Sequence, residues 1–343
     1  MDISHQFFES VNANLGYWIE KSKEIPLKDH ANVLRGVDFG LKLGETFSKA
    51  IDLAIKSYPL VERIGNFWDW IRVLEKQANS QKDRLPEDDC NLDILLGLFL
   101  VRVGEHRRAG RYLMKAYDHA SRLGMVKQTG DACYGLCLYY WGVKKFEKAE
   151  QFGLEALTHY RTLDQIEFPM GEALNALGMV AFSRKDYTKA ESFFLEAQDI
   201  GEGLGKELLF GRILNNLAMV KETIGEYKDA LELFGQAAEF IKSVGNTIDL
   251  CRLEVTRGVL HYKLGNIENA QSAFQRAVYP EWEDDLSPIY RAWVSLIRGY
   301  VCLIDGEREE AIELFQISVA YWERVDDEQM LECALSGLTE AKG

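Results

Sequence analysis

Cysteine and histidine are the residue types in this 343-residue chain that could form a nucleophile–base pair or hold a metal ion. Cys133 and Cys137 are four residues apart, so on a helix they share a face. No CxxC pair and no neighbouring histidine pair completes a zinc set around them. We therefore expect no metal and no cofactor, and we interpret the cysteines as small buried apolar residues. The cysteines are Cys90, Cys133, Cys137, Cys251, Cys302 and Cys333, and the histidines are His5, His30, His106, His119, His159 and His261.

Signatures of the common catalytic sites are missing from the sequence. The phosphate-binding pattern GxxxxGK[ST] does not occur, and neither do GxSxG or HExxH. No carboxylate lies in a run that is apolar enough to raise its pKa for acid catalysis. A Cys–His pair that only folding would bring together stays open as an alternative. The sequence otherwise predicts a protein that is not an enzyme.

Asparagine and methionine recur at matching places, which indicates binding rather than catalysis. Asn175 and Asn215 are 40 residues apart, with Asn216 beside the second, and Met179 and Met219 show the same spacing. An asparagine amide can both donate to and accept from an extended peptide backbone, while methionine suits an adaptable apolar wall. The alternatives are asparagines that bond within their own repeat and methionines that pack in the core.

An internal repeat positions these residues. Six alanines are separated by 40 or 41 residues: Ala109, Ala149, Ala190, Ala230, Ala270 and Ala311. Small residues stand twelve positions before each of them, at Gly97, Cys137, Gly178, Ala218, Gly258 and Gly299, and seven positions after, at Ala116, Ala156, Ala197, Ala237, Ala277 and Ser318. Four positions after the alanine come Leu113, Gly153, Phe194, Phe234, Phe274 and Phe315. In four repeats a glycine precedes the alanine by five positions, at Gly104, Gly225, Gly265 and Gly306, where a helix end commonly needs positive φ.

The stretch from Gly171 to Gly203 shows the pattern best, as two helices with Gly178, Ala190 and Ala197 at the points of close approach and Phe194 filling the seam. This is the tetratricopeptide pattern, although its usual period is about 34 residues. Residues 90–341 resemble the longer-period arrays of kinesin light chain, of Pins-type spindle adaptors and, more closely, of bacterial STAND-type signalling NTPases. The segment most like them is Leu214–Phe240. The resemblance implies an all-α fold, a right-handed solenoid of helical hairpins.

In this family the first helix of each pair lines the inner wall, and related peptide-binding arrays use its asparagines. The resemblance therefore implies a peptide-binding groove with a defined set of residues. A clamp for a terminal carboxylate is not favoured, because Arg212 and Arg252 are the only basic side chains in that set. The set is Tyr134, Leu138, Trp141, Glu172, Asn175, Met179, Phe182, Arg212, Asn215, Asn216, Met219, Glu222, Arg252, Val255, Val259 and Tyr262.

The periodicity predicts three parts: a helical segment over 1–85 that acts as a degenerate repeat or cap, six repeats over 86–325, and a C-terminal capping helix over 326–343. In the first part, hydrophobic spacing predicts helices over 3–23, 27–43, 46–64 and 67–79. The connection Ser80–Asp89 is expected to be a packed joint. The acidic and aromatic stretch Tyr279–Pro288 is either a contact site or an exposed loop.

Net charge, apolar runs and cysteine content limit the kinds of partner and the cellular location that we expect for this chain. The formal net charge of −14 argues against a nucleic-acid surface and is compatible with a basic protein partner. The N-terminus lacks the features of a signal peptide, and no uncharged apolar run is long enough to span a membrane. Scattered cysteines favour the cytoplasm over a disulfide-forming compartment. The sequence contains no pattern that indicates the oligomeric state.

The leading hypothesis is a cytoplasmic scaffold or adaptor that binds a peptide or helix of a protein partner in its groove. The sequence leaves two alternatives. One is a sensor or regulatory subunit whose NTPase or protease is on another chain, and the other is a receptor for a signalling peptide. The groove could also hold the chain's own N-terminal helix.

Overall fold

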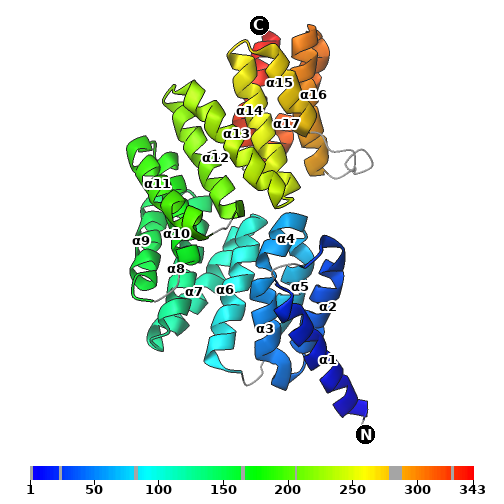
Figure 1. Cartoon of the computed structure of the whole chain (residues 1–343), viewed down its shortest axis with the longest axis vertical. Coiled ribbons are helices and arrows are strands. Elements are labelled where there is room, and N and C mark those ends of the chain that lie inside the picture. Colours follow the sequence, from blue (N-terminus) through cyan, green and yellow to red (C-terminus); the bar gives the residue numbers. More distant parts are fainter. Residues whose placement is uncertain are drawn as a thin grey trace. The chain divides into compact units, whose positions relative to one another are not determined.

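The computed structural model describes residues 3–22, 25–80, 84–163, 167–204, 207–277, 288–325 and 328–343. Helices joined by short turns make up these ranges, with no strand among them (Figure 1). The chain divides into two compact units, residues 1–209 and residues 210–343. None of the helices in the described ranges is long and apolar enough to cross a membrane. The stretch Tyr279–Pro288, proposed above as a contact site or loop, lies almost wholly outside the described residues.

The first unit begins with α1 (Ile3–Glu20), α2 (His30–Gly40), α3 (Phe47–Lys56), α4 (Tyr58–Ile64) and α5 (Phe67–Ala78), with short 3-10 turns at Leu27–Asp29 and Gly44–Thr46. The helix predicted over 46–64 is therefore wrong as a single element. Pro59 has no backbone N–H, and its ring would clash with the Ile55 carbonyl in a continuous helix. The chain instead ends α3 at Lys56 and starts again at Tyr58, which puts Pro59 in the first turn of α4.

Helical hairpins follow along both units. In the first unit they are α6 (Pro86–Arg102) with α7 (His106–Arg122), α8 (Val126–Gly142) with α9 (Phe146–Tyr160), and α10 (Glu167–Ser183) with α11 (Tyr187–Leu204). The second unit holds most of α12 (Glu207–Thr223), then α13 (Tyr227–Ser243), α14 (Thr247–Lys263), α15 (Ile267–Ala277), α16 (Pro288–Asp305), α17 (Arg308–Val325) and α18 (Glu328–Lys342). Figure 1 shows this succession of paired helices.

The repeated small residues hold each hairpin together, as predicted. All six reference alanines are fully buried, and so are the residues seven positions after them. A Cβ built on Gly178 would come within 2.4 Å of the Phe194 ring, and one on Gly258 within 2.6 Å of Phe274. The aromatic side chain of the second helix therefore lies directly on the backbone of the first. The predicted solenoid of small-residue helix pairs is confirmed.

The hairpin turns need a left-handed residue at one position. Gly104, Gly225, Gly265 and Gly306 have φ between 75° and 86° there. In the two remaining repeats the same position is occupied by Lys144 and Lys185, which are also left-handed, with φ of 58° and 63°. A side chain at positive φ is strained because its Cβ approaches the following carbonyl. The turns at Lys144 and Lys185 thus keep the left-handed backbone conformation at some cost in folding stability.

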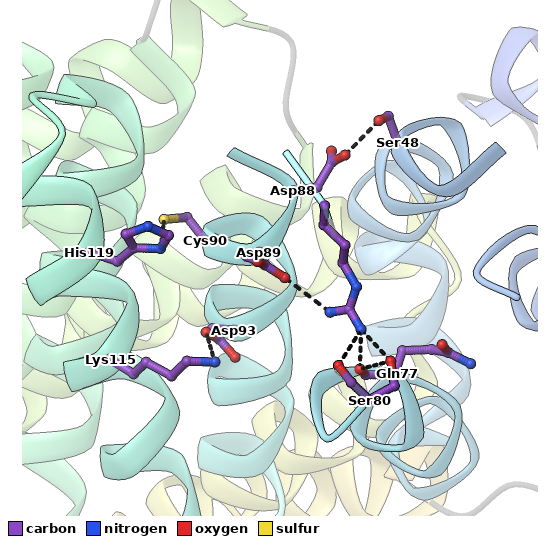
Figure 2. A network of polar contacts seen from close by, with 10 residues as sticks. Ser48, Gln77, Ser80, Asp88, Asp89, Cys90, Asp93, Lys115 and His119 are labelled. Atoms are coloured by element: carbon purple, nitrogen blue, oxygen red, sulfur yellow. Dashed lines mark hydrogen bonds and ion pairs between the residues drawn. The ribbon is translucent and has the colours of Figure 1, made fainter. Parts of the chain in front are cut away.

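Arg84 forms the joint between the N-terminal helices and the first hairpin. Its side chain is only 5 % exposed and lies 4.7 Å from the centre of the Phe47 ring. The guanidinium donates to the backbone oxygens of Gln77 and Ser80 and forms an ion pair of 3.0 Å with Asp89; these three partners are labelled in Figure 2. This cation therefore connects the end of α5, the aromatic start of α3 and the first turn of α6. Nearer the N-terminus, α1 packs on α2 and α3.

Matched glycine substitutions test the close helix approach within the second unit. Gly258→Ala should lower the free energy of unfolding by about 1–3 kcal/mol, because the Phe274 ring has to move. Gly235→Ala, on helix α13 with nothing within 4 Å of its Cβ, should raise it by about 0.5–1 kcal/mol. Chemical denaturation measures both. Equal effects of the two substitutions would contradict the packing described.

A turn substitution tests the strain at positive φ. Lys144→Gly should stabilise the first unit by up to about 1 kcal/mol, since glycine adopts this conformation without the Cβ clash. The control is Lys145→Gly, which alters the next residue, whose φ is −97° and needs no glycine. Thermal denaturation should show a higher midpoint for Lys144→Gly alone. A lower midpoint for Lys144→Gly would rule out the strain.

Candidate functional site

The candidate site of the first unit is a wall formed by partly exposed side chains of α4, α6, α8 and α10, which we call the unit-1 wall. Helix α8 packs against both α6 and α10, so the first helices of successive hairpins lie next to one another. Tyr58 of α4 stacks on Phe99 of α6 with ring centres 5.3 Å apart. The wall consists of Tyr58, Glu62, Leu98, Val101, Arg102, Tyr134, Leu138, Trp141, Glu172, Met179 and Phe182.

The charged groups of the unit-1 wall are paired with one another. Arg102 forms an ion pair with Glu62, and its Nε donates to the Tyr58 hydroxyl at 3.3 Å. Burial alone would lower the pKa of Arg102, but the Glu62 carboxylate together with Tyr58 and Tyr134 outweighs it, so the pKa is raised well above its usual value. On the next helices, the Tyr134 hydroxyl donates to Glu172 at 3.1 Å. The wall therefore offers a partner few unpaired charges.

Burial keeps both tyrosines of this wall protonated. Desolvation is the largest contribution that raises the pKa of Tyr58 and of Tyr134, and the Glu172 carboxylate raises the pKa of Tyr134 further. A protonated hydroxyl can donate to a carboxylate or to a peptide carbonyl. These tyrosines therefore act as hydrogen-bond donors throughout the physiological pH range.

The rest of the unit-1 wall is apolar. Leu138, Trp141, Met179 and Phe182 are all partly exposed, and the indole N–H of Trp141 donates to the Ser183 hydroxyl at 2.9 Å. Asn175, predicted to meet a peptide, is instead 7 % exposed and has its own polar contact. The neighbouring apolar side chains, rather than this asparagine, form the accessible surface.

The predicted groove residues of the second unit are described separately, and most of them are partly exposed. Arg212 forms an ion pair with Asp249, with 2.8 Å between Nε and Oδ2. Asn215 Nδ2 lies 3.4 Å from Asn216 Oδ1 and 3.7 Å from Met219 Sδ, and Arg252 is partly exposed. The predicted basic side chain Arg212 is thus already neutralised.

Two predicted residues of the second unit do not reach the surface. Val255 is fully buried and Val259 is 2 % exposed, and both belong to the core that includes Phe274 and Trp293. The correction has a simple cause: both valines lie on the side of α14 that the neighbouring hairpins cover. Tyr262, one turn later, is partly exposed and meets Tyr300 edge to face at 5.5 Å.

Helix α18 packs against α14, α16 and α17, and Gln329 Nε2 donates to Thr256 on α14 at 3.0 Å. A hollow of about 510 Å³ lies between α18 and the end of α14, lined by Lys263, Leu331, Glu332, Leu335, Ser336, Thr339 and Glu340. Burial and the Glu332 carboxylate raise the pKa of the predicted groove residue Glu222, while Lys263 opposes them. The sequence predicted α18 as a cap but gave no sign of this hollow.

Sequence reasoning missed Tyr58, Glu62 and Arg102 because the N-terminal segment lacks the repeat register. Leu98 and Val101 could have been found. They occupy, in the first hairpin, the places that Leu138 and Trp141 occupy in the second, 40 residues further on. Extending the register by one repeat would have placed both on the wall.

Within the described residues, folding brings Cys90 and His119 into contact, but the pair lacks the features of a nucleophile. Cys90 Sγ lies 3.5 Å from His119 Nδ1 (Figure 2). Burial, followed by the nearby carboxylates of Asp93 and Asp89, raises the pKa of Cys90 to about 11. Because the thiolate is the reactive form, this thiol stays protonated and unreactive at neutral pH.

Comparison with known proteins supports the repeat architecture. Sequence profiles described as "Tetratricopeptide repeat" match residues 169–243 and 255–279. The chain carries tetratricopeptide repeats.

Among curated proteins, it is 29 % identical over 117 residues to the human "Cell division cycle protein 16 homolog", covering 33 % of the chain and 18 % of that protein. It is 22 % identical over 234 residues to "Protein KINESIN LIGHT CHAIN-RELATED 3" of Arabidopsis thaliana, covering 65 % of the chain and 35 % of that protein. The chain thus matches between about a fifth and about a third of the length of these curated relatives.

Solved structures share the fold over almost the whole chain. A Rap protein "Complexed with Competence and Sporulation Factor" is 12 % identical with a TM-score of 0.62, covering 97 % of this chain and 98 % of that one. A STAND protein with a tetratricopeptide repeat sensor from Pyrococcus horikoshii is 16 % identical with a TM-score of 0.56, covering 94 % of this chain and 54 % of that one. At these coverages, both likenesses include most of the N-terminal segment 1–85.

Substitution of Arg102 tests the pairing within the unit-1 wall. Arg102→Met should lower the free energy of unfolding by about 1–3 kcal/mol, because it removes the ion pair of a carboxylate that is largely buried. The double variant Glu62→Gln/Arg102→Met should recover most of the loss, as measured by urea denaturation. If the single and double variants were equally destabilised, the pairing would not account for the loss.

Proposed function

We propose that this tetratricopeptide protein is a scaffold or adaptor that binds a peptide or helix of a partner protein on its first-helix walls. The unit-1 wall is the main contact surface. The second unit offers a separate candidate surface of its own, formed by Arg212, Asn215, Asn216, Met219, Glu222, Arg252 and Tyr262. The chain acts by binding rather than catalysis, and its six free, buried cysteines favour the cytoplasm as its location.

One observation carries the proposal: the unit-1 wall exposes large apolar side chains while its charges are internally paired. Leu138, Trp141, Met179 and Phe182 are partly exposed on two adjacent helices. Contiguous apolar surface rimmed by polar groups is typical of protein interaction sites, and aromatic side chains contribute most to their affinity. Because Arg102 and Glu62 neutralise each other, the preferred partner presents apolar anchors rather than a charged terminus.

A second candidate is a receptor for a signalling peptide. It is supported by the fold that 97 % of this chain shares with the Rap protein complexed with Competence and Sporulation Factor. A regulatory subunit that works with an NTPase on another chain is supported by the likeness to the STAND protein's repeat sensor. The two differ in their ligand: a receptor would bind a short free peptide, and a regulatory subunit would bind a folded protein.

Two matched double variants test the binding wall by affinity capture from the native host. Leu138→Glu/Met179→Glu places charge on the unit-1 wall and should reduce partner recovery at least about tenfold, as expected for truncated or charged interface anchors. Leu154→Glu/Leu195→Glu makes the same change on the second helices α9 and α11, where both leucines are more than 40 % exposed. This control should recover the partner at the level of the wild-type protein.

Circular dichroism shows whether the two variants stay folded. Equal recovery of the partner by both variants would remove the unit-1 wall from the mechanism. Captured partners then separate the two candidates. A captured ligand that is a short free peptide supports the receptor, whereas a peptide segment or helix that belongs to a larger captured protein supports the adaptor or regulatory subunit.

A further inference from the structure

Three side chains that can each bind a metal meet inside the second hairpin of the first unit. Cys133 comes from α8, while Glu155 and His159 stand one turn apart on α9. One ligand atom from each lies within 4.8 Å of the other two, and His159 Nε2 is 3.9 Å from Glu155 Oε1. Cys133 is buried, whereas the side chains of Glu155 and His159 are both 30 % exposed.

The same three repeat positions hold different chemistry in the neighbouring hairpins. In the first hairpin they are Asp93, Lys115 and His119, and Asp93 forms an ion pair of 2.9 Å with Lys115 (Figure 2). In the third hairpin they are Leu174, Glu196 and Ile200, two of which are apolar. The fold therefore brings these positions together in successive repeats, but only in the second hairpin of these three does each position carry a metal-binding side chain.

We propose that Cys133, Glu155 and His159 form a binding site for a divalent transition-metal ion of the zinc type, with water as a fourth ligand. Thiolate, imidazole and carboxylate together suit zinc, which accepts tetrahedral sites of mixed nitrogen, sulfur and oxygen ligands. Bonds of about 2.0–2.3 Å place such ligand atoms roughly 3.5 Å apart. Rotation of the two partly exposed side chains toward Cys133 closes the remaining distance.

Sequence reasoning predicted no metal because it looked for ligands close together in the chain. Here 22 residues separate Cys133 from Glu155, and the turn between two helices brings them together. Tyr117 of the preceding hairpin completes the arrangement, since its hydroxyl donates to Glu155 Oε1 at 2.8 Å. Hydrogen bonds of this kind orient a ligating side chain and strengthen metal binding.

Metal binding at this site releases a proton, because a cysteine binds a metal as the thiolate. The S–H bond breaks as the metal–sulfur bond forms, and the proton passes to solvent.

Cobalt titration of the full chain, freed of metal by a chelator, tests the site. Wild-type protein should bind one equivalent of Co²⁺ with a thiolate-to-cobalt charge-transfer band in the near ultraviolet, and Zn²⁺ should displace it. Cys133→Ser should abolish the band. Tyr117→Phe should weaken binding by about tenfold, because Glu155 loses its orienting hydrogen bond.

His159→Ile is a second variant that the fold should tolerate, because the third hairpin carries Ile200 at this position. His159→Ile should weaken Co²⁺ binding at least tenfold, because it removes a proposed ligand and loss of a hydrogen bond that only orients a ligand already costs about tenfold. Two control variants should keep the band: Cys90→Ser, beside His119, and Cys302→Ser, which lies near Glu307 and Glu310. Absence of the band from the wild type, or its survival in Cys133→Ser, would overturn the proposal.

Discussion

The contact between an aromatic side chain of one helix and a glycine of the paired helix is the interaction on which the rest of this structure depends. Phe194 lies on Gly178 and Phe274 on Gly258, each at a distance that excludes even a methyl group. Because the backbones approach this closely, the two helices of a hairpin are held in a fixed relation. Buried alanines then allow neighbouring hairpins to pack in the same way. Rigid hairpins of this kind fix which side chains remain accessible on the first helices.

Those accessible side chains make a surface whose polarity is balanced internally. Arg102 with Glu62, and Arg212 with Asp249, use their charges on one another. Charges that are paired on the surface contribute little to long-range attraction, so under the proposed function this surface would select a partner by shape and apolar contact. Within the first unit, Trp141 and Phe182 supply that contact, and the Tyr134 hydroxyl is already bonded to Glu172. Recognition here would thus be short-ranged.

The fold was predictable because its determinants are local and repeated. The small residues every 40 or 41 positions can be recognised from the sequence without knowing which distant segments are in contact. Lys144 occupies the position that glycine holds in four other repeats, so its left-handed backbone follows from the repeat. Pro59 could have signalled the break between α3 and α4. The candidate site was less predictable. Val259 was predicted to line the groove but is buried, because burial depends on which hairpin covers a given helix face. Arg102 was missed because its partners Glu62 and Tyr58 come from the N-terminal segment, which does not follow the repeat spacing.

The C-terminal helix has a consequence for how the second unit unfolds. Besides α17, α18 packs on α16 and on α14, and Gln329 reaches Thr256 two hairpins earlier in the sequence. In a linear array each unit contacts only its neighbours, and the ends fray independently. A contact that skips a hairpin reduces this freedom, because α18 must release α14 as well as α16 and α17 before it can detach.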